Sequence, residues 1–241
     1  MNISELKDRV LFALSVPKCI RCNQKLDYGQ KAFCPKCSAE FEEIKTRNCS
    51  KCAKILSECS CSTRDLEAHF IKNITKSFRY NPREENLSAN SLIYSLKRDN
   101  RSDVLKRCTD EMCTALLNTH NITEDFVITN VPRRRRAIVR YGIDHSELLA
   151  KSVAKSLGVK YIRTLKSRAK SEQKLLTRDE RLKNTDFTLL TKESLEGKKI
   201  IIVDDIITTG ASVGSAAVMI RALRPKSIYA AALAIAYKDD L

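Results

Sequence analysis

The sequence is poor in several residue types, and each shortage excludes a class of structure. Tryptophan is absent and the aromatic residues are seven Phe and seven Tyr, so an extended platform for stacking nucleobases is not expected. With only six Gly and five Pro in 241 residues, the chain is neither collagen-like nor a low-complexity linker. No apolar run approaches the roughly 18 residues that a membrane-spanning helix needs, so no membrane span is expected.

The beginning of the chain lacks the features of a secretory signal. The apolar run Val10–Val16 follows the acidic residues Glu5 and Asp8 and is not followed by a small-residue cleavage site. We interpret Ile3–Ser15 as a short amphipathic helix with Ser4 as a candidate N-cap. These features predict a soluble, cytoplasmic protein.

The chain carries a large surplus of positive charge. Lys and Arg number 44 against 29 Asp and Glu, which gives a formal net charge of +15. Such a surplus raises the local concentration of anions and favours polyanionic partners such as nucleic acid or phosphorylated ligands. The alternative is a solvated basic surface that only aids solubility.

Eight of the ten cysteines precede residue 62 and come in close pairs, as metal ligands do. Cys19-x2-Cys22 and Cys34-x2-Cys37 form a strong four-cysteine zinc pattern, in which each pair directs two thiolates at one tetrahedral ion. Cys49-x2-Cys52 and Cys59-x-Cys61 predict a second site, although its last pair is one residue shorter. Ligands shared between the two sets, redox-active dithiols and disulfides are the alternatives. We favour a structural role, because a module with so little apolar content needs such a staple to fold.

The cysteine pattern divides the chain into a cysteine-rich module, residues 1–65, and an α/β region, residues 66–241. Strands that alternate with helices predict a parallel twisted sheet with helices on both faces. Apolar spacing predicts helices over Asn86–Lys97, from a Ser102 cap through Leu117, over His145–Leu157 with Gly158 as C-cap, and over Ser212–Leu223. Strands are predicted over Phe126–Val131, Tyr161–Leu165, Lys199–Val203 and Ser227–Ile235.

The most specific motif is an apolar strand followed by two carboxylates, a small-residue turn and a helix. The strand ends at Val203, the acids are Asp204 and Asp205, and the turn is Thr208–Ser212. Small residues let the backbone approach a ligand, and the free N–H groups of a helix start point at an anion. Two adjacent carboxylates are not expected in the core, because burying them unpaired costs several kcal/mol. They suit the vicinal hydroxyls of a ribose, or a metal held by those hydroxyls.

This motif resembles the signature of type I phosphoribosyltransferases. The resemblance implies a ligand such as phosphoribosyl pyrophosphate or ribose 5-phosphate, bound with Mg²⁺. It makes Asp204 and Asp205 catalytic, ribose-binding acids. The loop around the 5-phosphate would be formed by Thr208, Thr209, Gly210, Ala211 and Ser212.

Over nearly its full length the chain resembles the ComF family of competence proteins. The resemblance rests on the paired cysteines, on Val131–Arg136, on Gly142–Ala150 and on Gln173–Asn184. The segment Ile143-Asp144-His145 departs from the usual Phe-Asn-Gln of the family. The family implies a role in DNA uptake and natural transformation, a zinc finger, single-stranded DNA as a partner, and a ComFA-like DNA-uptake helicase as a further partner.

Two basic segments are interpreted through the resemblance. Pro132, Arg133 and Arg134 would form the pyrophosphate loop, because the planar guanidinium binds phosphate oxygens bidentately. The alternative is a solvated run of charge. The polar stretch Lys166–Asn184 is predicted to be a mobile loop that leads into a short helical turn. Either it closes over the reactants as a lid or it tracks a single strand of DNA, and the sequence does not rank the two. The residues that the resemblance assigns to this flexible loop are Lys170, Gln173, Lys174, Arg178 and Arg181.

Three functions remain open from the sequence. The first is an active phosphoribosyltransferase that positions its reactants and stabilises charge, with an unidentified nucleophile. The second, which we favour, is a binding protein that handles single-stranded DNA and keeps the ribose-phosphate pocket. The third is a zinc-module adaptor that docks a DNA helicase. The remaining Cys108 and Cys113, and the lone His69, His120 and His145, are interpreted as structural.

Overall fold

A computed structural model describes most of the chain. The described residues are 16–63, 66, 67, 69, 71, 73–84, 87–99, 101–133, 138, 139, 142–167, 187–191 and 193–236. The predicted helix Ile3–Ser15 and most of the predicted loop Lys166–Asn184 lie outside these residues. Lys166 and Ser167 are the exceptions and belong to a short strand.

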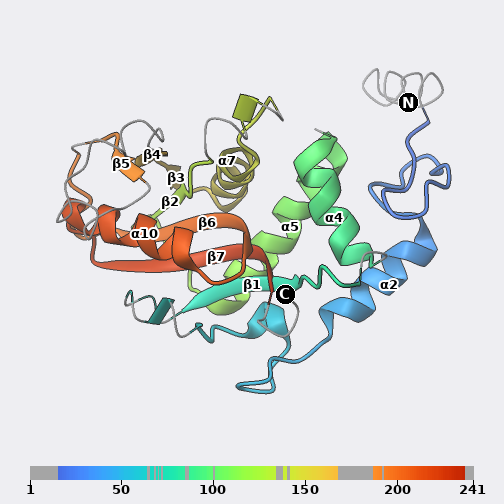
Figure 1. The fold of residues 1–241 in the computed structure, drawn as a ribbon, viewed down its shortest axis with the longest axis horizontal. Helices are drawn as coiled ribbons and strands as arrows, with labels where there is room; N and C mark the ends of the chain where they lie inside the picture. Colours follow the sequence, from blue (N-terminus) through green and yellow to red (C-terminus); the bar gives the residue numbers. More distant parts are fainter. Residues whose placement is uncertain are drawn as a thin grey trace.

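A five-stranded sheet forms the centre of the fold, and every pairing in it is parallel (Figure 1). Its order is β1-β7-β6-β2-β3. The strands are β1 Ile74–Arg79, β7 Ser227–Ile235, β6 Lys199–Ile207, β2 Phe126–Asn130 and β3 Lys160–Tyr161. The parallel sheet confirms the predicted fold class, and β7 has its predicted bounds. Sequence patterning missed β1, because only Ile74 and Phe78 of its six residues are apolar.

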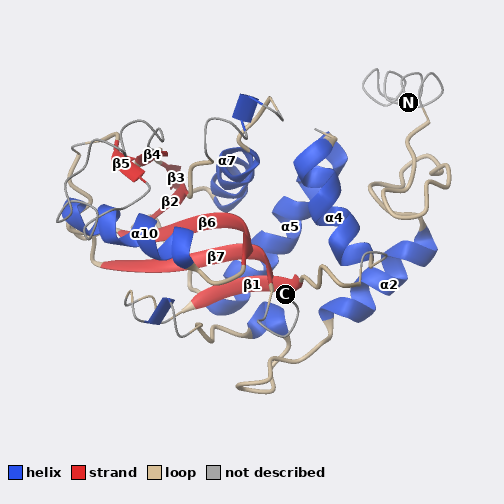
Figure 2. Cartoon of the chain, viewed as in Figure 1, coloured by secondary structure: helices blue, strands red, loops and turns tan. Residues whose placement is uncertain are grey.

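The helices flank the sheet as predicted (Figure 2). They are α2 Pro35–Lys45, α4 Ser88–Arg98, α5 Ser102–Thr119, α7 His145–Leu157 and α10 Ala211–Ile220. The bounds of α7 match the prediction, and Gly158 ends it in the left-handed conformation at φ 68°. Ser102 is the first residue of α5 and Arg101 is its N-cap, so the predicted Ser102 cap is wrong by one position. The predicted helix Ser212–Leu223 ends as the short 3-10 helix Arg221–Leu223.

Alternate residues of the strands point to opposite faces of the sheet, and each face has its own core. On one face Ile201 and Val203 of β6 pack in a cluster that includes residues of α2, α4, α5 and α7. On the other face Ile200 and Ile202 pack with α10 and with Leu66. All four β6 side chains are completely buried.

Two strand predictions are corrected by the structure. The predicted strand Tyr161–Leu165 is divided, because β3 ends at Tyr161 while β4 Leu165–Ser167 pairs antiparallel with β5 Phe187–Leu189 in a separate two-stranded sheet. Strand β6 continues beyond Val203 to Ile207, because its pairing with β7 extends as far as Ile207 and Ile235. The two acids therefore lie inside the strand rather than after it.

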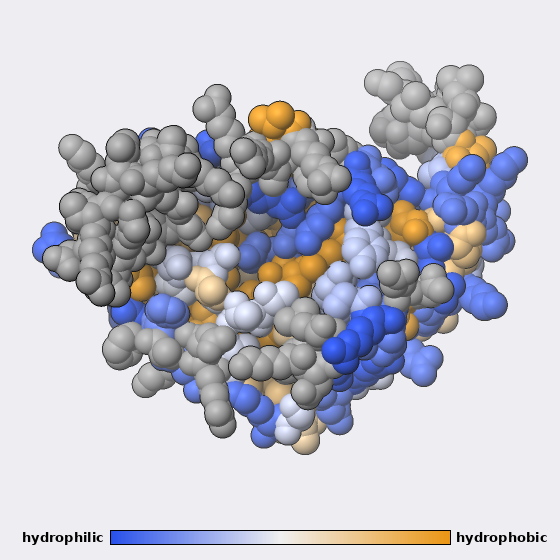
Figure 3. All heavy atoms as spheres, viewed as in Figure 1, coloured by the Kyte–Doolittle hydropathy of each residue, from blue (hydrophilic) through white to orange (hydrophobic). Residues whose placement is uncertain are grey.

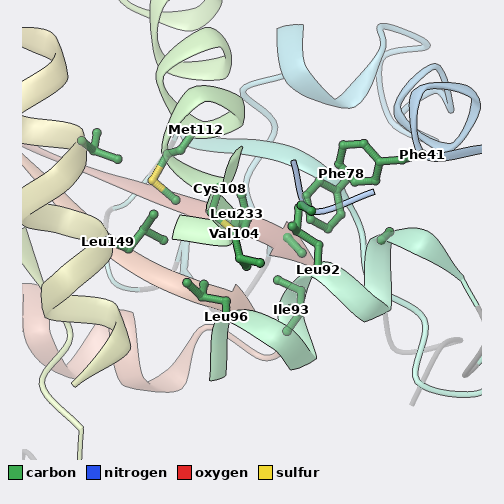
Figure 4. Packing of buried hydrophobic residues seen from close by; sticks show 14 of the residues in the cluster. Phe41, Phe78, Leu92, Ile93, Leu96, Val104, Cys108, Met112, Leu149 and Leu233 are labelled. Atoms are coloured by element: carbon green, nitrogen blue, oxygen red, sulfur yellow. The ribbon is translucent and has the colours of Figure 1, made fainter. Parts of the chain in front are cut away.

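Part of the cysteine-rich region packs into the main core. Phe41 of α2 meets Phe78 of β1 edge to face, with ring centroids 5.2 Å apart (Figure 4). Cys19, Cys34 and Cys37 belong to the same cluster of buried residues. The division at residue 65 thus marks a change in composition, and independent folding of the two parts stays a proposal.

The surface of the molecule is largely hydrophilic over α2 and α4 in the view of Figure 3. Within the described ranges, no helix has both the length and the apolar character needed to cross a membrane.

Candidate functional site

The acid pair lies near the carboxyl end of β6, at the edge of the sheet where ligands of parallel α/β folds bind. The Asp205 amide donates to Oδ1 of Asp204 at 2.9 Å, and the Ile206 amide donates to Oδ1 of Asp205 at 2.8 Å. Each carboxylate is thus oriented by the amide of the next residue.

Asp205 is buried, contrary to the expectation that neither acid belongs to the core. The physical reason is that Asp205 is paired. Its Oδ2 accepts a hydrogen bond from Nη2 of Arg133 and lies 3.4 Å from Nζ of Lys97. Arg133 comes from the loop after β2 and Lys97 from α4, so three elements meet at this carboxylate. The cost of burying an ionised carboxyl falls when it is paired in this way.

Asp204 has a different environment from its neighbour. Burial, followed by the charge of Asp205, raises the pKa of Asp204 to about 8. The two adjacent acids thus have different surroundings: Asp205 is held in ion pairs, whereas burial and the charge of Asp205 favour the protonated form of Asp204.

The loop after β6 forms a small pocket with the start of α10. The lining residues are Asp204, Ile206, Ile207, Thr208, Thr209, Gly210, Ala211, Ser212 and Val213. The hydroxyl-bearing residues Thr208, Thr209 and Ser212 are exposed, while Gly210 is buried. The structure therefore brings together the predicted loop residues and Asp204 around one hollow.

Gly210 is the N-cap of α10 and has φ 85°, a conformation that only glycine adopts without strain. Gly210 itself has no side chain to cap the helix, and the Ala211 amide donates to Oγ1 of Thr209 at 3.3 Å. Because the first amides of a helix lack intrahelical partners, the start of α10 offers donors to an anion in the pocket. With the exposed hydroxyls of Thr208 and Ser212, the loop can hold a phosphate group.

A capping residue that sequence reasoning did not identify orders the loop after β2. Asp144 is the N-cap of α7, and its Oδ1 accepts from the Glu147 amide at 3.1 Å. Its Oδ2 accepts from the Arg133 amide at 3.0 Å. The Asp-x-x-Glu pattern at 144–147 is the signal that could have identified this cap. Asp144 thus fixes the backbone of the arginine that pairs with Asp205.

Ser146 and Lys97 are further residues that the sequence analysis missed. The Ser146 hydroxyl is within hydrogen-bond distance of the Val131 carbonyl, at 3.1 Å, and of the Val203 carbonyl, at 3.2 Å. It therefore ties the end of β2 to β6 beside the acid pair.

Lys97 belongs to a helix that was predicted from its apolar spacing. No local motif marks Lys97 itself, because its partner Asp205 is more than 100 residues away in the sequence.

The other predicted site residues are placed only in part. Pro132 and Arg133 lie at the sheet edge next to β6, but Arg134 lies outside the described residues. The predicted flexible-loop residues Lys170, Gln173, Lys174, Arg178 and Arg181 also lie outside them.

The cysteines form two compact clusters, each with four sulfur atoms within 4.8 Å of one another. We call Cys19, Cys22, Cys34 and Cys37 the first cluster, and Cys49, Cys52, Cys59 and Cys61 the second cluster. This grouping agrees with the predicted pairing of neighbouring motifs and involves no exchange of ligands between the sets. All eight cysteines are free thiols rather than disulfides.

The sulfur geometry fits a tetrahedral zinc ion. A Zn–S bond of ~2.3 Å places neighbouring sulfurs about 3.8 Å apart. The sulfurs of Cys22 and Cys34 are 3.7 Å apart, and those of Cys52 and Cys59 are 3.5 Å apart. Burial and neighbouring thiols raise the pKa of Cys61, which favours its protonated form in the absence of a bound cation. Both clusters can therefore hold zinc.

Comparisons with known proteins agree with this arrangement. Residues 143–240 match the family model of the phosphoribosyl transferase domain. The DNA utilization protein YhgH of Escherichia coli O6:H1 is 25% identical over 213 residues, which cover 85% of this chain and 91% of that protein. The family model confirms a phosphoribosyl transferase domain in the C-terminal part of the chain, which follows the cysteine-rich N-terminal region.

Solved structures similar to this chain include two adenine phosphoribosyltransferases. The enzyme from Thermoanaerobacter pseudethanolicus is 18% identical and has a TM-score of 0.36, with 55% of this chain and 80% of that chain covered. The enzyme from Saccharomyces cerevisiae is 16% identical and has a TM-score of 0.35, with 56% of this chain and 70% of that chain covered.

Proposed function

We propose that the chain binds phosphoribosyl pyrophosphate with Mg²⁺ at the carboxyl end of β6 and acts in the handling of single-stranded DNA during DNA uptake. The observation that carries the first part is the pocket in which Asp204, exposed hydroxyls and the start of α10 converge. The match of residues 143–240 to a phosphoribosyl transferase domain supports the same ligand.

In this proposal each group has a defined role. Asp204 and Asp205 bind the vicinal hydroxyls of the ribose. The hydroxyls of Thr208, Thr209 and Ser212 and the first amides of α10 hold the 5-phosphate. Arg133 binds the diphosphate and leaves its ion pair with Asp205 in order to do so. Mg²⁺, when bound with the ligand, supplies charge neutralisation at the diphosphate and at the ribose hydroxyls.

A melting experiment tests this part of the proposal. A ligand at ~100 times its dissociation constant adds about 2.7 kcal/mol of stability, so phosphoribosyl pyrophosphate with Mg²⁺ raises the melting temperature. The double variant Thr208→Val/Ser212→Ala loses most of this shift. Ser194→Ala, in an exposed loop, is the matched control and keeps it. No shift in the wild-type protein contradicts the proposal.

DNA handling is supported by the net charge of +15 and by the likeness to a DNA utilization protein. Binding through phosphate neutralisation releases counterions, so the logarithm of the affinity falls linearly with the logarithm of salt concentration. The slope for single strands is about −0.7 per phosphate contacted.

The double variant Lys170→Ala/Lys174→Ala tests this expectation. It should make the slope of the logarithm of affinity against the logarithm of salt concentration shallower by roughly 1.4, equally for all DNA sequences. Lys36→Ala with Lys106→Ala, on α2 and α5, is the control. Salt-independent binding, or none at low salt, contradicts this part of the proposal.

An active transferase is the second candidate, and the match of residues 143–240 to a phosphoribosyl transferase domain favours it. Such an enzyme releases pyrophosphate from phosphoribosyl pyrophosphate when the correct acceptor is present. A screen of nucleobases with a pyrophosphate assay distinguishes turnover from binding alone. Docking of a ComFA-like helicase stays a prediction of the family resemblance, which co-purification of the two proteins tests.

A further inference from the structure

We propose that the second cluster positions the loop Thr208–Ser212, so that metal in this cluster raises the affinity for a sugar phosphate while metal in the first cluster does not. The inference rests on the proposed ribose-phosphate site. It states that residues outside this site hold the loop Thr208–Ser212 in position. One chain of contacts leads from Cys59 to Gly210.

The first link is a buried lysine. Lys76 of β1 is 1% exposed, and its Nζ donates to Sγ of Cys59 at 3.1 Å. The same ammonium donates to the carbonyls of Cys59 at 3.0 Å and Cys61 at 3.1 Å. A buried charge needs partners of this kind, and a metal-bound thiolate carries the complementary charge. Metal in the second cluster therefore holds the backbone at residues 59–61 against the sheet.

The second link is the segment that leaves the cluster. The Ile74 amide donates to the Ser60 carbonyl at 3.1 Å, next to β1. The Ser62 hydroxyl donates to the Ile71 carbonyl at 2.6 Å, and the Ile71 amide donates to the Leu66 carbonyl at 2.9 Å. Ser62, Leu66 and Ile71 are all buried. The position of Leu66 is thereby tied to the end of the second cluster.

The third link reaches the phosphate loop. A Cβ atom added to Gly210 would lie 2.5 Å from Cγ of Leu66, so the two residues are in close contact. The ring of His69 closely approaches Gly214 of α10, and the His69 carbonyl accepts a hydrogen bond from Arg221. Leu66 and His69 thus pack against α10 at its beginning and at its first turn. Movement of this segment would release the backbone that faces the anion.

The first cluster has different neighbours. Arg101 donates to the Lys18 carbonyl at 2.7 Å, and the Ala32 amide donates to Asp103 at 2.8 Å. These contacts lead to the start of α5, on the face of the sheet opposite to α10. Among the described residues, no hydrogen bond recorded for the first cluster leads to Leu66, Gly210 or Gly214. Its metal is therefore expected to stabilise the fold without adjusting the loop.

The coupling is reciprocal by thermodynamic necessity. If metal in the second cluster raises the affinity of the loop for the ligand, the bound ligand must raise the affinity of the second cluster for metal by the same factor. Couplings between sites are typically about 5- to 150-fold, and packing through a few side chains places the expected factor near the lower bound.

The experiment measures the zinc affinity of the full-length protein by equilibrium competition with a coloured chelator. With phosphoribosyl pyrophosphate and Mg²⁺ present, about half of the zinc is bound several-fold more tightly, while the affinity for the other half is unchanged. The Cys59→Ser variant should bind only the zinc ion of the first cluster, which the ligand does not affect. Calorimetric titration adds a second measurement, in which Lys76→Met weakens ligand binding by about fivefold. Lys106→Met, an exposed lysine of α5 paired with Asp110, is the control and leaves the affinity unchanged.

The outcomes are separable. If the wild-type protein binds the ligand but the ligand leaves the affinity for both zinc ions unchanged, the positioning role is wrong and the proposed function stands. If calorimetry detects no ligand binding by the wild-type protein, the proposed function fails and the inference fails with it. If Lys76→Met does not fold, the zinc affinities of the wild-type protein still decide the question.

Discussion

The first and second clusters begin with nearly the same turn. Asn23 has φ 61° and Ala53 has φ 58°, each one residue after its Cys-x2-Cys motif. The amide of each donates to the carbonyl of the first cysteine, at 3.0 Å for Asn23 and 2.9 Å for Ala53. One local geometry, which brings two sulfurs to the same side, is thus used twice in the chain.

Beyond this turn the two clusters differ. In the first cluster Cys34 is the N-cap of α2, with Pro35 at the first helical position. In the second cluster the chain passes through the 3-10 helix Leu56–Glu58 and ends in Cys59-x-Cys61 without a long helix. The first cluster therefore attaches a helix to the main core, whereas the second attaches a short 3-10 helix to β1 and α5 and is followed by the segment that reaches α10 through Leu66.

The two similar cysteine clusters thus belong to unequal parts of the molecule. Cys19, Cys34 and Cys37 belong to a large core shared with the sheet. Cys49 and Cys59 pack with Leu56 in a small cluster of their own. We expect loss of the first site to affect the whole fold and loss of the second to act locally.

The largest predicted effect compares one cysteine from each cluster. Cys19→Ser should remove one zinc ion and lower the free energy of unfolding by more than about 4 kcal/mol, because it opens the shared core. Cys59→Ser should also remove one ion but leave the main thermal transition in place. Metal analysis with calorimetry checks both. A zinc-free protein with a near-native transition contradicts the structural role of the clusters.

The next prediction compares the apolar anchors. Phe41→Ala removes a completely buried ring that stacks on Phe33 and meets Phe78, and it should cost about 4 kcal/mol. Leu56→Ala, in the small cluster beside Cys59, should cost about 2 kcal/mol. Denaturant unfolding of the two variants gives the comparison. Equal costs would show that the second region belongs to the same cooperative core.

A smaller effect is expected at two glycines in the left-handed conformation. Gly210→Ala should cost about 3 kcal/mol, since its Cβ displaces Leu66 in addition to the backbone strain. Gly158→Ala is the matched control, because no atom of the described residues beyond its chain neighbours lies within 4 Å of its added Cβ, and it should cost about 1 kcal/mol. Only Gly210→Ala should weaken ligand binding. Equal effects of the two substitutions on ligand binding would show that Leu66 does not support the loop.

The smallest predicted effect is the pH dependence from Asp204. Burial and the charge of Asp205 raise its pKa from 3.8 to about 8, so the unfolded state releases the proton first as the pH rises. The folded state then binds more protons, and stability falls between about pH 4 and pH 8. Asp204→Asn should remove this contribution and gain roughly 1–2 kcal/mol at pH 8, less than the full shift because Asp204 is only half-buried. The exposed Asp110→Asn is the control. The same pH dependence in Asp204→Asn and in the wild-type protein contradicts the assignment.

The sequence predicted the parts of the molecule that depend on local signals. The spacing of apolar residues and Gly158 predicted α7, and the cysteine spacing predicted both clusters. It missed β1, because only Ile74 and Phe78 of this strand are apolar and the partners of the buried Lys76, Cys59 and Cys61, are not its neighbours in the sequence. It also missed Lys97, whose role depends on a contact between α4 and β6. Pairing with β7, rather than local propensity, extends β6 through the acid pair.

A calorimetric titration of phosphoribosyl pyrophosphate with Mg²⁺ tests the ribose site without intermediate steps. The wild-type protein should bind one ligand per chain. The double variant Asp204→Asn/Asp205→Asn should keep its fold and zinc content but bind at least 100-fold more weakly, equivalent to about 2.7 kcal/mol. An unchanged affinity in the double variant would contradict the assignment of the ribose site to the carboxyl end of β6.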